Sequence, residues 1–283
     1  MKVQLENKLM SSLLLYVDHH ILKEGEAFTN TSTNLYKINQ EYSGYQSYAA
    51  PYKQLVADTS ITSANILSGV TYNGTFYSTG STGPALHSVN HYNGQFYLAN
   101  TVDESLLSAS YAVKDFNVHL TAKPESELLF ETKFNLKPRV TQNTTGLRDE
   151  QQTFPSIFVK NLGGRNEPFS FGGQENSVYN VRNIILSDSA FNLDAAINIL
   201  RDRARDYVPI VDQSDLPFNA LGGSVSGYNY EDLIKDKAGT SLAYISNATI
   251  SKDLGGGYGN SLNPSVYSAF VNYEMEIIRY PRA

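Results

Sequence analysis

The clearest hydrophobic pattern in the chain is helical and lies between residues 192 and 207. Apolar side chains recur there at spacings of three and four residues, which places them on one face of a helix: Leu193, Ala196, Ile197, Leu200, Ala204 and Tyr207. Asn192 is expected to cap the N-terminal end, and Pro209 is expected to stop the helix. Because the opposite face is charged and includes Arg201 and Arg205, the helix is predicted to pack by one side only.

A second helical stripe lies near the N-terminus, where Leu5, Leu9, Ser12, Leu13, Tyr16 and His20 share one face. The apolar run at 9–17 is shorter than the ~18–20 residues that a membrane span needs. Charged and polar residues also stand where a signal peptide would be cleaved. We therefore predict an amphipathic helix over 5–22 in a protein made in the cytoplasm.

Strand patterns dominate the rest of the chain. Two Asn-Gly pairs flanked by aromatic and β-branched residues, in 70–77 and 89–98, predict β-hairpins with two-residue turns. Two further strands are predicted around Val113–Leu120 and Leu128–Phe134. The pattern resumes at Ser156–Lys160 and Ser177–Leu186, and the alternation over Val271–Ile277 predicts a strand with one buried face.

These elements predict an α+β fold, in which a mixed or antiparallel sheet is flanked by amphipathic helices and carries a β-rich insertion of hairpins. We divide the chain into 1–58, an N-terminal helix followed by a polar extended arm over Gly25–Ser60; 59–150, the hairpin insertion; and 151–283, a core that the N-terminal helix completes.

Composition and charge narrow the possible functions. The 283 residues include 20 Tyr, 20 Gly and no Trp or Cys, a composition typical of β-rich proteins and one that excludes disulfides and thiolate metal sites. With 22 basic and 28 acidic residues the formal charge is −6. Because contact with nucleic-acid phosphates needs clustered Lys and Arg, the balance argues against wrapping of DNA or RNA.

Side chains that carry chemistry are few. His87 and His91 have a spacing that binds zinc on a helix, but in a strand four residues span ~13 Å, and the adjacent His19 and His20 point in different directions on a helix. No Gly-rich run matches a phosphate loop, a dinucleotide fingerprint or a nucleophile elbow. We expect no catalytic residue, no cofactor and no metal site.

Glu274 and Glu276 form the remaining pair of interest. Two residues apart on a strand, they share a face at ~6.5–7 Å along the backbone, a separation that inverting glycosidases use for their two carboxylates. The alternation of a strand with a solvated or interfacial face accounts for the same spacing, and we favour this second interpretation.

The order of these elements resembles the α/β fold of tail-terminator and tail-completion proteins, which are neck proteins of tailed bacteriophages. The resemblance rests on residues 5–22, 154–210 and 266–280, with the β-rich segment inserted between the first helix and the first sheet strand. The stretches Phe154-Pro-Ser-Ile-Phe-Val159 and Ala112-Val-Lys-Asp-Phe116 are also similar to virion structural proteins of large tailed phages.

The resemblance implies a non-catalytic virion protein that forms a homo-oligomeric ring, a hexamer, at the junction of neck and tail, either as tail terminator or as head-to-tail connector. Its partners would be the tail tube and sheath proteins and the portal-side connector, with DNA passing through unbound and no membrane. The loop at 161–175 would face a partner ring or the lumen. Interface residues would be Arg201, Arg205, Arg165, Phe169, Phe171, Glu274 and Glu276.

Two other classes remain open. The abundance of Tyr also fits a fibre-like or carbohydrate-binding virion module, which predicts trimers and retention on polysaccharide. A hydrolase predicts a tight cluster of Asp, Glu or His in a cleft.

Overall fold

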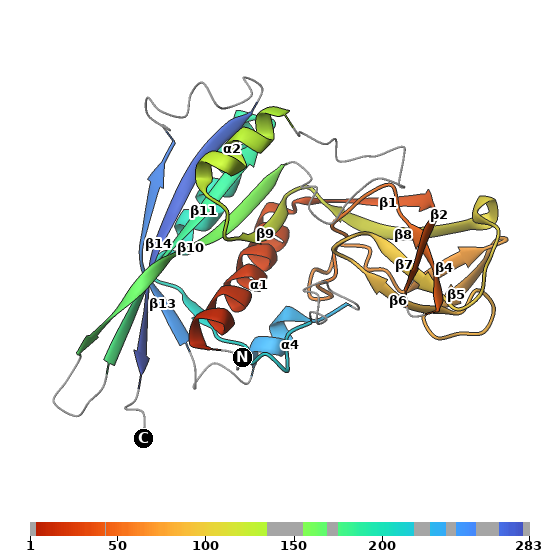
Figure 1. Cartoon of the computed structure of the whole chain (residues 1–283), viewed down its shortest axis with the longest axis horizontal. Coiled ribbons are helices and arrows are strands. Elements are labelled where there is room, and N and C mark those ends of the chain that lie inside the picture. The colour runs from red at the N-terminus through yellow and green to blue at the C-terminus, as the bar shows by residue number, and fades with distance from the viewer. Residues whose placement is uncertain are drawn as a thin grey trace.

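The computed structural model describes residues 4–42, 44–134, 155–168, 175–217, 227–235, 242–252 and 266–279. It has two parts joined side by side: a six-stranded sheet with helices, and a β-rich unit of two four-stranded sheets (Figure 1). The first part contains α1 (Leu5–Gly25), β9 (Asn117–Thr121), α2 (Glu125–Phe134), β10 (Ser156–Pro168), β11 (Glu175–Ser187), α3 (Ala190–Asp202), β12 (Tyr207–Pro209), α4 (Tyr230–Lys235), β13 (Leu242–Ser251) and β14 (Tyr267–Arg279). The β-rich unit contains β1 (Phe28–Asn34), β2 (Tyr36–Tyr42), β3 (Tyr45–Ala49), β4 (Gly69–Tyr72), β5 (Thr75–Ser78), β6 (Leu86–Asn90), β7 (Gln95–Leu98), the 3₁₀ turn η1 (Glu104–Leu106) and β8 (Leu107–Lys114). The predicted α+β class is confirmed.

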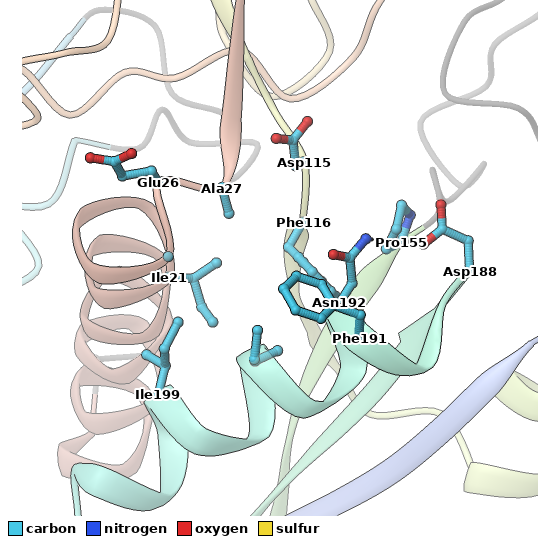
Figure 2. A pocket seen from close by; sticks show the side chains of 13 residues that line it. Ile21, Glu26, Ala27, Asp115, Phe116, Pro155, Asp188, Phe191, Asn192 and Ile199 are labelled. Atoms are coloured by element: carbon cyan, nitrogen blue, oxygen red, sulfur yellow. Dashed lines mark hydrogen bonds between the residues drawn. The ribbon is translucent and has the colours of Figure 1, made fainter.

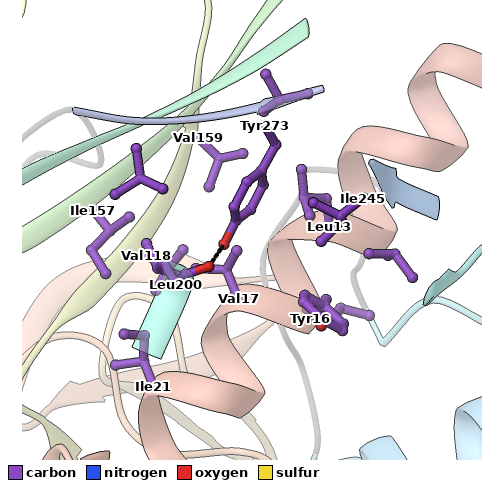
Figure 3. Packing of buried hydrophobic residues seen from close by; sticks show 14 of the residues in the cluster. Leu13, Tyr16, Val17, Ile21, Val118, Ile157, Val159, Leu200, Ile245 and Tyr273 are labelled. Atoms are coloured by element: carbon purple, nitrogen blue, oxygen red, sulfur yellow. Dashed lines mark hydrogen bonds between the residues drawn. The ribbon is translucent and has the colours of Figure 1, made fainter. Parts of the chain in front are cut away.

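The six-stranded sheet has the order β12-β13-β14-β11-β10-β9, and it is antiparallel except between β9 and β10. The alternation predicted for the last strand is confirmed, because the odd residues 271–277 of β14 are buried and the even ones are half-buried. The odd residues pack with α1 and α3 in the largest core cluster. In Figure 3 the side chain of Tyr273 reaches from β14 toward the helices, where its hydroxyl donates a hydrogen bond to the carbonyl of Leu200 at 2.6 Å.

Helix α3 buries the predicted residues Leu193, Ala196, Ile197 and Leu200 but is shorter than expected. Its N-cap is Ser189, whose hydroxyl accepts a hydrogen bond from the amide of Asn192 at 3.1 Å, so the assignment of Asn192 as the cap is wrong. The helix ends at Asp202. Tyr207 therefore leaves the helical stripe and belongs to β12, where 58% of it is exposed.

The second face of the sheet is covered at one end by α2. Leu128 and Leu129 of this helix pack on Phe158, Ile184 and Phe270. The strand predicted over this segment is wrong. Both leucines are fully buried, and two adjacent buried side chains do not fit a strand with one wet face. The carbonyl of the residue preceding α2 also accepts hydrogen bonds from the amides of the third and fourth residues of the helix.

The β-rich unit consists of sheets β1-β8-β4-β5 and β2-β3-β7-β6, whose buried side chains form one shared core around Tyr48, Phe96 and Tyr111. The polar arm predicted over Gly25–Ser60 is wrong, because this segment supplies β1, β2 and β3 to these two sheets. The unit thus begins at β1 and not at residue 59, and β9 and α2, which we assigned to the insertion, lie in the six-stranded part.

The two predicted hairpins differ. Between β4 and β5, Asn73 (φ 48°) and Gly74 (φ 76°) form the expected two-residue turn. Between β6 and β7 four residues intervene and only Gly94 has a positive φ, so the second turn was predicted too short. The longer loop is held by the preceding segment, since the amides of Ala50, Gln54 and Leu55 donate hydrogen bonds to its carbonyls.

The C-terminal half of α1 lies between the two parts of the molecule. Leu22 packs with Val56, Ile61 and Ala112 in a small cluster at the joint. This second contact surface explains why α1 buries residues on more than one side, whereas its sequence predicted a single stripe.

Candidate functional site: the open face of the six-stranded sheet

Beyond α2, the second face of the six-stranded sheet is free of helices in the described part of the chain. Figure 1 shows β10, β11 and β14 continuing to the lower left, past the helices. Strand register brings Arg165, Val178, Glu276, Tyr244 and Tyr207 into one row across five strands. We call this surface the open face.

The next two rows of the open face are polar. Asn180, Glu274 and Asn247 follow one another across β11, β14 and β13. Lys160, Arg182, Asn272 and Thr249 form the row closest to α2. An open hollow of about 290 Å³ lies among these residues and is bordered by Leu162, whose exposed fraction is 44%.

Ion pairs and amide contacts fix the side chains of this surface. Arg182 donates to Asn272 at 2.7 Å and to both carboxylate oxygens of Glu125 at 2.8 Å, which ties the sheet to the start of α2. Farther out, the Arg165 guanidinium lies 3.8 Å from the Glu274 carboxylate. Their side chains are 56% and 40% exposed, so solvent screens this pair and it adds little to stability.

The structure thus brings three predicted interface residues together. Arg165, Glu274 and Glu276 share the open face. Arg201 and Arg205 lie on the other side of the sheet, at the C-terminal end of α3. Phe169 and Phe171 lie outside the described residues.

The Gly-rich loop predicted over 161–175 is mostly strand. β10 continues through Pro168 and β11 begins at Glu175, with an irregular register between Asn161 and Gly164. Gly163 has φ 98°, and a Cβ on Gly164 would come within 2.6 Å of the Val178 carbonyl, so both glycines are needed for the kink and not for a long loop.

Sequence reasoning missed Tyr207, Tyr244 and Arg182 on this face. Tyr207 had been assigned to a helical stripe, which ends five residues earlier in the structure. Buried and less buried residues alternate around Arg182 in β11, and Arg182 lies at one of the less buried positions. This alternation was the sequence signal that could have placed Arg182 on the open face. The pairing of Tyr207 with Tyr244, with ring centroids 5.0 Å apart, depends on a register that no local pattern encodes.

The strongest cluster with catalytic residue types lies elsewhere, where His19, Asp58 and Ser60 meet. Asp58 Oδ2 lies 2.7 Å from His19 Nδ1, and the Ser60 hydroxyl lies 3.4 Å from the same nitrogen. A serine relay needs the hydroxyl and the carboxylate on opposite ring nitrogens. The Ser60 hydroxyl instead donates to Asp58 Oδ1 at 2.7 Å, so the geometry is that of a structural clamp.

Electrostatics agree with that structural role. Burial alone would raise the pKa of Asp58, but hydrogen bonds from His19, the Ser60 hydroxyl and amide, and the Tyr230 amide outweigh burial and lower the pKa below its ordinary value. The Tyr230 ring also stacks on His19 with centroids 4.5 Å apart. The clamp therefore connects α1, the segment after β3 and α4.

The histidine pair considered for zinc does not converge, because His87 is exposed on β6 whereas His91 is buried. Across the described ranges, no three His, Asp or Glu side chains gather as a metal site would require. None of the helices described is both long and apolar enough to span a membrane.

No protein-family model matches the chain, and no curated protein is significantly similar to it.

Proposed function

We propose that the chain is a structural protein of a tailed-bacteriophage virion whose copies form a ring, a hexamer, at the junction of neck and tail. The role is that of a tail terminator or a head-to-tail connector, without catalysis. The observation that carries the proposal is the grouping of Arg165, Glu274 and Glu276 on an open face whose strands project past the helices.

The chemistry of the open face supports this role. An exposed pair such as Arg165 and Glu274 is worth little within one chain, so its charges can be exchanged for contacts to a neighbouring protein at small cost. Exposed tyrosine and arginine side chains are enriched at protein interfaces. We assign the open face to contact with a partner ring, the tail tube or the sheath.

Net charge supports the passage of DNA through such a ring. A formal charge of −6 opposes tight binding to phosphates, so DNA slides through the lumen without a specific site.

The first experiment measures the mass of the purified chain by light scattering and images the particles by negative staining. We expect rings, or monomers that become rings when tail tubes are added. Monomers that remain monomeric with tail tubes present contradict the proposal.

A charge reversal tests the open face. Arg165→Glu should retain the far-UV circular dichroism of the wild type and lose co-sedimentation with tail tubes. The new carboxylate would repel Glu274 and would reverse the charge that residue 165 offers to the tube. The matched control is Lys252→Glu, which breaks the exposed pair between Lys252 and Asp194 (2.7 Å) outside the open face. Equal tube binding by Arg165→Glu and the wild type would exclude the open face from the contact.

A carbohydrate-binding virion module is the second candidate, favoured by the adjacent rings of Tyr207 and Tyr244 in the same row as Glu276. Aromatic faces beside carboxylates and amides are suited to sugar rings. This candidate predicts trimers and retention on immobilised polysaccharide that Tyr207→Ala abolishes. Rings that flow through such a column contradict it.

A further inference from the structure

A groove lies between the C-terminal end of α1 and the exposed side of α3, which lines it as far as Ile199. It has a volume of about 250 Å³. Figure 2 shows Ile21 of α1 and Ile199 of α3 on one side of the groove, and Phe116 and Phe191 on the other side. Phe191 is 83% exposed, the largest exposed fraction among the large apolar residues described. An apolar ring on the surface beside an apolar groove is typical of a contact site.

Carboxylates surround this groove. Glu26, Asp115 and Asp188 border it, and its described lining includes no Lys, Arg or His. Glu26 and Asp188 are exposed, and Asp115 accepts a hydrogen bond from the Thr29 hydroxyl at 3.2 Å. The groove is therefore complementary to an occupant that has both apolar surface and positive charge.

The chain presents a positive charge and an apolar ring together just after the C-terminal end of α3. Arg205 is exposed and has φ 74°, a left-handed conformation that is rare for a residue with a side chain. Its amide donates to the Ile245 carbonyl at 2.8 Å, and the Ile245 amide donates to Asp206, so β13 holds this turn in place. The exposed ring of Tyr207 follows immediately.

Arg205 differs from its neighbouring arginines in its partners. Arg201 is bound by Asp202 at 3.1 Å, and Arg203 lies 3.3 Å from Glu24 and 3.1 Å from Asp206. For Arg205, no ion pair is formed with any residue in the described part of the chain. Of the three arginines described between 201 and 205, Arg205 therefore offers its guanidinium to a second molecule.

The groove runs along α3 from Asp188 to Ile199, and the Arg205 turn follows the C-terminal end of the helix. At about 100° per residue, Phe191 and Ala195 fall on the face of α3 opposite its buried stripe, and Ile199 falls between that face and the stripe. Two copies placed side by side can therefore bring the groove of one against the turn of the next. Because the two surfaces differ, the contact repeats from copy to copy and generates a ring when the rotation closes.

We propose that the groove formed by α1 and α3 binds the Arg205–Tyr207 turn of a second copy of this chain. The guanidinium faces the acidic border of the groove formed by Glu26, Asp115 and Asp188, and the Tyr207 ring packs against Phe191. The inference rests on the proposed ring and names its lateral contact, which uses Tyr207 at the edge strand of the open face but not Arg165, Glu274 or Glu276.

A charge-swap complementation tests this contact. One variant carries Glu26→Lys and Asp188→Lys, and the other carries Arg205→Glu. Each alone should stay monomeric at concentrations at which the wild type forms rings, because every contact would join like charges. Their equimolar mixture should form rings of wild-type mass in which the two variants alternate, since every groove then meets a turn of opposite charge.

Controls separate the possible failures. Lys252→Glu should assemble like the wild type, and Phe191→Ala should lose most ring formation without a charge change. Circular dichroism confirms that each variant is folded. Groove variants that form rings alone, or a mixture that stays monomeric, overturn the lateral contact while the proposed ring stands. A wild-type chain that never assembles overturns both.

Discussion

At the scale of single residues, His119 couples the stability of the fold to pH. Its ring is buried on β9, where it stacks on Phe158 and its Nδ1 lies 2.7 Å from the Tyr92 hydroxyl. Burial, together with the nearby positive charges of Lys114 and Lys53, lowers the pKa of His119 to about 3. The folded protein therefore holds a neutral imidazole at neutral pH.

The sign of the pH dependence follows from this lowered pKa. An unfolded chain binds a proton at His119 below about pH 6.5, whereas the folded chain binds it only near pH 3. The free energy of unfolding should thus fall as the pH decreases below 6.5, by up to about 1.4 kcal/mol per pH unit from this residue. We expect His119→Gln to flatten that slope in urea denaturation between pH 7.5 and 5.

The matched control for that prediction is His87→Gln. His87 is exposed on β6, so this variant removes a histidine without disturbing a buried one, and we expect the wild-type slope to be retained. The chosen range stays above the pH at which the carboxyl of Asp58 titrates, because the pKa of Asp58 is lowered from 3.8. An unchanged slope in His119→Gln would exclude His119 as the source of the pH dependence.

At the scale of elements, the turn between β4 and β5 gives the sharpest test of local sequence. Asn73 is exposed and adopts the left-handed conformation that an alanine there must also adopt at a cost of about 1–2 kcal/mol. We expect Asn73→Ala to lower the free energy of unfolding by up to that amount, and Asn73→Gly to lower it much less. Equal losses in the two variants, measured by urea denaturation, would exclude backbone strain as the cause.

Some elements were predictable from the sequence because their burial pattern is local. The alternation in β14 and the stripe in α3 each come from one element that packs by one face, so spacing alone identified them. The same alternation placed Glu274 and Glu276 on one surface. Arg165 joined them only through the antiparallel pairing of β10, β11 and β14. The prediction of two strands joined by a loop implied part of this pairing.

Other elements were decided by contacts that a local pattern does not contain. The leucines of α2 form a helix because the sheet presents Phe158, Ile184 and Phe270 to them, and tertiary packing overrides a weak local pattern. The segment 28–49 is polar because its strands form one-sided, partly exposed sheets, and it was taken for an arm. Both the groove at α3 and the row containing Tyr207 depend on side chains from distant segments.

At the scale of the whole molecule, polar contacts join the β-rich unit to the six-stranded part. Lys114 at the end of β8 donates to both carboxylate oxygens of Asp18 in α1 at 2.8 Å. These side chains are only 13% and 7% exposed. The Tyr228 hydroxyl also hydrogen-bonds to Asp18. The joint is therefore held by a buried ion pair in addition to the small apolar cluster around Leu22.

A buried ion pair stabilises a joint only while both partners are present. Lys114→Met should lower the free energy of unfolding by about 3–5 kcal/mol, because the Asp18 carboxylate would stay buried without its cation. Adding Asp18→Asn removes that charge and keeps an acceptor for the Tyr228 hydroxyl, so the double variant should recover to within about 1–2 kcal/mol of the wild type. Urea denaturation followed by circular dichroism measures both values. A double variant no more stable than Lys114→Met would mean that packing of the lysine stem, and not its charge, holds the two parts together.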